Sequence, residues 1–83
     1  MANWRGWSAK LSRPIELRNG TTFRTLADVR DFILEQPEHI QARSFWQHAA
    51  KQLINAAEEG GDIETATKQI ELALFFEGHF VLR

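Results

Sequence analysis

Apolar and polar residues alternate along the first part of the chain, which predicts a strand with one buried face. The odd positions of 7–17 are apolar, except where Arg13 and Pro14 interrupt the alternation. Because proline has no amide hydrogen to give to a neighbouring strand, we expect regular pairing to begin after Pro14. The apolar residues of this segment are Trp7, Ala9, Leu11, Ile15 and Leu17.

The dipeptide Asn19-Gly20 predicts a turn, and the register of the two strands decides the length of the loop. A two-residue loop would place Phe23 on the opposite sheet face from Ile15. A three-residue loop over 18–20, with its glycine in the left-handed conformation, pairs Ile15 with Phe23 instead. We therefore expect a β-hairpin with the longer loop.

Helix caps and helical spacing predict three helices after the hairpin. In the first, Thr25 is the expected N-cap and accepts from the amide of Asp28, and Pro37 ends the helix after about ten residues. The second and longest helix starts between Glu38 and Phe45, with Ser44 as a rival start, and runs to about Glu58. The apolar faces of these two helices are Leu26, Val29, Phe32 and Ile33, and Ala42, Trp46, Ala49, Ala50, Leu53 and Ala57.

Gly60-Gly61 is expected to end the second helix and Asp62 to cap the third, so that the two helices form an antiparallel hairpin. Gly78 ends the third helix, and the apolar tail 79–82 is expected to add a third strand to the sheet. The apolar face of the third helix is Ile63, Ala66, Ile70, Ala73 and Leu74.

These elements predict an α+β fold of order ββαααβ: a β-hairpin, three helices and a short C-terminal strand. The second and third helices are expected to pack across one face of the small antiparallel sheet, with Trp46 as a core anchor. Residues 1–83 are expected to form a single domain, in which 1–11 are a loose or docked N-terminal arm. A chain of this length buries only about 60 to 65% of its unfolded surface, so the core is thin.

Composition and motifs limit the enzymatic and metal-binding functions that the chain can have. The absence of cysteine excludes disulfides, thiolate nucleophiles and cysteine-ligated metals, and it fits a reducing compartment. No apolar stretch suits a signal peptide or a membrane span, which needs about 20 residues, so we expect a cytoplasmic protein. Phosphate-loop, nucleophile-elbow, zinc and calcium motifs are missing from the sequence, and His39, His48 and His79 lack the spacing of metal ligands. We therefore expect neither an enzyme nor a cofactor or metal.

Charge is unevenly distributed along a chain whose net charge is −1. Residues 1–30 hold six basic and two acidic residues, whereas 31–83 hold four basic and nine acidic residues. Either the two halves neutralise each other within the fold, or the basic half faces an acidic partner or nucleic acid. The candidate contact surface is Trp4, Arg5, Trp7, Lys10 and Arg13. In the alternative interpretation, the two tryptophans fold back onto the core.

The third helix has a wider apolar face than one neighbour can cover, because Leu72, Phe75 and Phe76 lie beside its main stripe. Either the C-terminal tail and the first helix pack there, or the patch pairs with a second copy in a homodimer. The expected function is therefore a small protein-interaction, regulatory or scaffold module. A nucleic-acid-binding accessory protein is the alternative, and a small enzyme is the least favoured interpretation.

The segments RPIEL, NG, TLADVRDFI ending at QP, FWQHAAKQLINAA, GGD and ATKQIELAL follow one another along the chain. Their order and spacing resemble a family of small uncharacterised bacterial proteins, a domain of unknown function frequent in alphaproteobacteria. The resemblance covers about residues 12–80. Gln36 departs from it, because the family has an aromatic residue or leucine before the proline. The resemblance implies a compact α+β fold of fewer than about 100 residues and carries over no functional residues.

Overall fold

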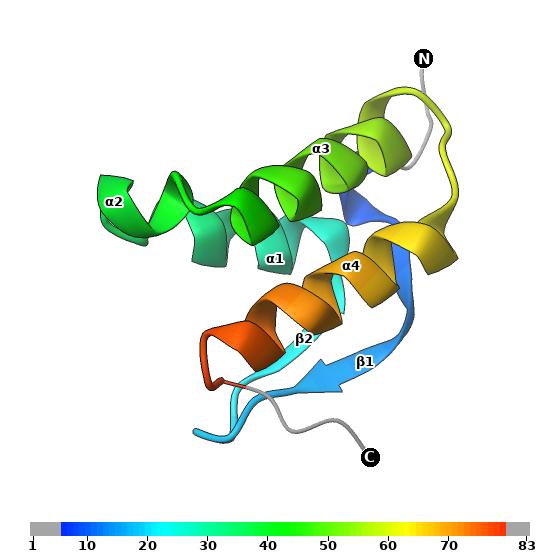
Figure 1. Cartoon of the computed structure of the whole chain (residues 1–83). Helices are drawn as coiled ribbons and strands as arrows, with labels where there is room; N and C mark the ends of the chain where they lie inside the picture. Colours follow the sequence, from blue (N-terminus) through cyan, green and yellow to red (C-terminus); the bar gives the residue numbers. More distant parts are fainter. Residues whose placement is uncertain (1–5, 80–83) are drawn as a thin grey trace.

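The computed structural model describes residues 6–79, which form a two-stranded antiparallel sheet with helices packed around it (Figure 1). The elements are a short 3-10 helix η1 (Gly6–Ser8), strands β1 (Lys10–Glu16) and β2 (Thr22–Thr25), and helices α1 (Leu26–Leu34), α2 (Glu38–Gln41), α3 (Ser44–Glu58) and α4 (Ile63–Phe76). The α+β class predicted from the sequence is confirmed. Within this described part of the chain, no helix has the length and apolar character that a membrane crossing requires.

The hairpin has the expected three-residue loop. Ile15 pairs with Phe23, and the amide of Gly20 donates to the carbonyl of Leu17 at 3.0 Å. Gly20 has a φ of +93°, a conformation that residues with a Cβ rarely adopt. The prediction from strand register is therefore confirmed.

The middle of β1 is irregular. Lys10 pairs with Thr25, whereas Ile15 pairs with Phe23, so β1 advances five residues while β2 advances two. The extra residues form a bulge that contains Pro14, where an amide hydrogen is missing from the ladder. Regular pairing starts at the residue after the proline, as expected from the sequence, but the pair of Lys10 with Thr25 precedes it.

The bulge is bound to α4 through Thr67. The amide of Ser12 donates to the Thr67 hydroxyl at 3.1 Å, and that hydroxyl donates to the carbonyl of Ile63 at 2.8 Å. Thr67 is fully buried. At the bulge, the Ser12 amide has no partner on β2, and the Thr67 hydroxyl takes that place. Loss of this partner would cost roughly 1–3 kcal/mol.

The predicted helix ends are confirmed. The Thr25 hydroxyl accepts from the amide of Asp28, and the Asp28 carboxylate accepts from the amide of Thr25, which completes a capping box. Asp62 caps α4 by accepting from the amide of Thr65 at 3.0 Å. Gly60, with a φ of +72°, follows the end of α3.

The predicted order ββαααβ is wrong in its helices, because the expected second helix is divided into α2 and α3. The chain leaves the helical conformation at Arg43, which is extended with a φ of −64° and a ψ of 142°. The Arg43 guanidinium donates to the carboxylate of Glu77, just beyond α4, at 3.0 Å. Helix α3 begins at the rival start, Ser44. Of the predicted strand 79–82, all but its first residue lies outside the described residues.

The arrangement of the helices also differs from the prediction. Helix α4 packs on β1 and α1 packs on β2, whereas α3 packs mainly on α4 and α1 (Figure 1). The reason is that β2 continues directly into α1, which keeps this helix beside its strand. The predicted hairpin of two long antiparallel helices is present as α3 and α4 (Figure 1). However, the helix pair that covers the sheet is α1 and α4.

Trp46 of α3 is the core anchor that the sequence predicted, with only 1% of its surface exposed. Its ring lies 6.0 Å from that of Phe32 and 6.2 Å from that of Phe45. Within residues 6–79 its indole nitrogen finds no acceptor, which costs roughly 1–3 kcal/mol. Packing around the ring must outweigh this loss.

We predict that Thr67→Val destabilises the protein by about 1–3 kcal/mol, because valine has a similar shape but cannot accept from the Ser12 amide. Urea unfolding followed by circular dichroism measures the change. The matched control is Thr21→Val, at an exposed position, which we expect to change the unfolding free energy by less than about 0.5 kcal/mol. Equal stabilities for the two variants would contradict the role of Thr67.

Candidate interaction surfaces

Trp7, a residue of the candidate contact surface, packs within the fold. It is half-buried against the core, and its indole nitrogen donates to the carboxylate of Glu58 on α3 at 3.1 Å. The guanidinium of Arg30 on α1 lies 5.1 Å from the centroid of the Trp7 ring, within the range of a cation–π interaction. These contacts hold η1 against two helices.

Arg13, a second residue of that surface, binds two carboxylates of α4, the nearly buried Glu71 and the more exposed Glu64. Its Nε donates to Glu71 Oε2 at 3.0 Å and its Nη2 donates to Oε1, a bidentate pair. Its Nη1 lies 3.2 Å from Glu64. Hydrogen bonds from Ser12 and Arg13 lower the pKa of the Glu64 carboxyl below its ordinary value. This contact joins the basic half of the sequence to the acidic half.

Of the remaining residues of the candidate surface, the structure describes only Lys10. Lys10 is exposed on β1. Trp4 and Arg5 lie outside the described residues. The sequence alone could not decide whether Trp7 and Arg13 pack within the fold or stay exposed. Their partners, Glu58 and Glu71, are more than 50 positions away in the sequence.

The histidines are placed apart. His48 on α3 is exposed, as its helical position predicts, and His39 on α2 is exposed too. His79 packs edge-on against Phe32, with the ring centroids 5.5 Å apart. Over residues 6–79, histidines, aspartates and glutamates form no group of three or more that could hold a metal ion.

An exposed apolar cluster lies on α4 and the start of α3. Leu72, Phe75 and Phe76 are 40%, 45% and 60% exposed, respectively. Phe76 contacts Phe75 and Phe45, with ring centroids 5.9 Å and 5.5 Å apart. Of the two covers predicted to act together, the first helix leaves these side chains exposed, and all but the first residue of the tail 79–82 lies outside the described residues. We call these four residues the α4 aromatic patch.

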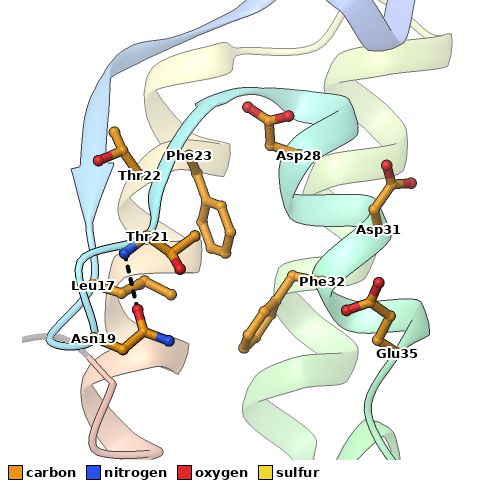
Figure 2. A pocket seen from close by; sticks show the side chains of 9 residues that line it. All are labelled: Leu17, Asn19, Thr21, Thr22, Phe23, Asp28, Asp31, Phe32 and Glu35. Atoms are coloured by element: carbon orange, nitrogen blue, oxygen red, sulfur yellow. Dashed lines mark hydrogen bonds between the residues drawn. The ribbon is translucent and has the colours of Figure 1, made fainter.

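A groove of about 410 Å³, here called the α1 groove, lies between the β-hairpin and α1 (Figure 2). Its apolar lining is Leu17, Phe23 and Phe32, and its acidic lining follows one side of α1. The sequence contains a signal for this site that the sequence analysis missed: Asp28, Asp31 and Glu35 are spaced three or four residues apart around Phe32. The polar lining residues are Asn19, Thr21, Thr22, Asp28, Asp31 and Glu35.

One carboxylate of the α1 groove is fixed by backbone amides. Asp28 Oδ2 accepts from the amide of Arg24 at 2.9 Å and from that of Thr25 at 3.1 Å. These bonds, that from Arg24 above all, lower the pKa of Asp28 below its ordinary value of 3.8. Asp28 therefore stays ionised and holds the start of α1 against the end of β2.

Comparison with known proteins adds no functional assignment. No family model matches the chain, and neither the curated proteins nor the solved structures contain a match. The resemblance to a family of small bacterial proteins therefore stays a prediction, and the case for function depends on the surfaces described above.

We predict that Asp28 contributes to the loss of stability in acid. Because its folded-state pKa is lower than the unfolded value, its contribution is complete above the unfolded pKa and is lost as the pH falls through the folded pKa. Urea unfolding between about pH 5.5 and pH 2.5 should show a shallower decline for Asp28→Asn than for the wild type. Parallel declines for the two proteins would contradict this assignment.

Proposed function

We propose that this protein is a small interaction module that self-associates through the α4 aromatic patch. The observation that carries the proposal is a cluster of partly exposed apolar side chains at the start of α3 and the end of α4, in which Phe45, Phe76 and Phe75 contact one another and Leu72 lies one helical turn before the last two. Contiguous apolar patches mark interaction sites, whereas single exposed apolar residues such as Leu34 are ordinary surface features.

The charges around the patch favour a second copy of the chain as the partner. The two carboxylates of α4 and its C-cap nearest the patch are already paired within the fold: Glu71 binds Arg13, and Glu77 lies 3.0 Å from Arg43. In a two-fold pairing centred on the patch, the C-terminal half of one α4 faces that of the other. The charges brought together are then neutral ion pairs, so that repulsion between like charges is avoided.

The size of the patch predicts a weak dimer. Fully burying an aromatic side chain removes about 150–250 Å² from water, so the exposed parts of the patch amount to roughly 300 Å² per copy. A standard interface buries about 800 Å² per partner. We therefore expect a dissociation constant on the order of micromolar to millimolar, as in a regulatory or scaffold module.

The other candidate functions have less support. Nucleic-acid binding draws on Trp7 and Arg13, whose side chains are engaged by Glu58, Glu64 and Glu71 within the fold. A small enzyme has no comparable support, because within residues 6–79 no three histidines, aspartates or glutamates gather into a group that could hold a metal ion.

We predict that Phe75→Gln/Phe76→Gln weakens self-association at least about tenfold, because it removes most of the apolar area at the patch without adding charge. Sedimentation velocity from about 10 µM to 1 mM measures the association constant. Leu34→Gln is the matched control, because Leu34 is 66% exposed but lies at the end of α1.

The control variant should associate like the wild type. A wild-type protein that remains monomeric through the millimolar range would overturn the proposal. So would a double variant that associates as strongly as the wild type while circular dichroism shows it to be folded.

A further inference from the structure

We propose that the α1 groove binds a short extended peptide, supplied by another protein, in which basic and apolar residues alternate. The peptide pairs with the free edge of β2 and places its basic side chains against α1. The site shares no residue with the α4 aromatic patch, and its occupation does not require self-association.

The first support is the direction of the backbone groups of β2. The amide of Leu17 donates to the carbonyl of Thr21 at 2.7 Å, so these residues form a hydrogen-bonded pair. Bonded and non-bonded pairs alternate in antiparallel strands, so the amide and carbonyl of Thr22 point away from β1. The amide of Arg24 points the same way and is bound by Asp28. The edge of β2 at Thr22 is therefore open to a further strand.

The second support is an apolar floor that suits one side chain of an added strand. The rings of Phe23 on β2 and Phe32 on α1 lie 5.3 Å apart, and Leu17 points toward them from the hairpin (Figure 2). Leu17 and Phe23 are buried, and the part of the floor that stays exposed belongs to Phe32, which is only partly buried. An aliphatic side chain of a bound peptide would bury the exposed part of this floor.

The third support is the charge of the opposite wall. Asp28, Asp31 and Glu35 follow one another along α1 (Figure 2), and seven helical residues span about 10 Å. This length equals about three residues of an extended peptide, so two basic residues separated by one apolar residue can reach different carboxylates. Asp31 pairs with Arg30 at 3.0 Å, but both side chains are exposed, and such a pair is easily exchanged.

These features together favour a basic peptide over a small cation and over nucleic acid. A peptide backbone supplies both the acceptor and the donor that the amide and carbonyl of Thr22 lack. The carboxylates of α1 attract lysine or arginine and repel phosphate. The occupant is therefore a basic extended peptide segment.

The test is fluorescence anisotropy at low salt with a fluorescein-labelled, acetylated peptide of sequence VKVKV. We expect saturable binding that weakens with added salt, and no binding of the acidic peptide VEVEV. Asp31→Lys/Glu35→Lys should weaken binding at least about tenfold. This variant should stay folded, because Glu35 follows the last residue of α1, where a cation is favourable.

The matched control is Glu38→Lys/Glu59→Lys, which changes the net charge equally at two exposed positions outside the groove. It should bind VKVKV within about twofold of the wild type. Two further peptides test the pairing with β2: one is methylated on the backbone nitrogen of the central valine, and the other on that of a neighbouring lysine. At least one of the two methylations should weaken binding about tenfold. Equal loss in both charge variants, or full binding of both methylated peptides, would overturn the proposal.

Discussion

The structure depends on the way in which α4 compensates for a strand that cannot pair along its whole length. Pro14 and the bulge around it remove the middle of β1 from the ladder with β2. Thr67 takes the free amide of Ser12, and Glu71 takes the guanidinium of Arg13. One side of α4 is thereby committed to β1 and another to α3. The side that remains exposed carries Leu72, Phe75 and Phe76.

The aromatic residues connect this arrangement to both proposed surfaces. Neighbouring rings lie between 5.3 Å and 6.2 Å apart in a continuous series. Trp46 in the middle of the series and Phe23 at one end are buried, whereas Phe32 is partly buried and Phe75 and Phe76 are exposed. The series therefore borders the α1 groove and reaches the surface at the α4 aromatic patch, so the same packing supports the fold and supplies apolar area for partners. In order, the rings are Phe23, Phe32, Trp46, Phe45, Phe76 and Phe75.

The sequence predicted the features that depend on near neighbours. The hairpin loop and the caps at Thr25 and Asp62 were predicted correctly, because each depends on residues within a few positions. The start of α3 was left open between Glu38 and Phe45, since Arg43, the residue before it, binds Glu77, which is distant in the sequence although it lies at the same end of the helical hairpin. The α1 groove was missed for a related reason. It exists only because α1 packs back against β2, an arrangement that periodicity does not contain.

The central claim is that the bulge of β1 is fixed to α4, which in turn determines the side of α4 that stays exposed. Amide hydrogen exchange at Ser12, followed by NMR, tests this claim most directly, because the residue is exposed but its amide is bonded to a buried hydroxyl. The account predicts that this amide exchanges as slowly as those in the core of α4. Exchange at the rate of a free, solvent-exposed amide would contradict it.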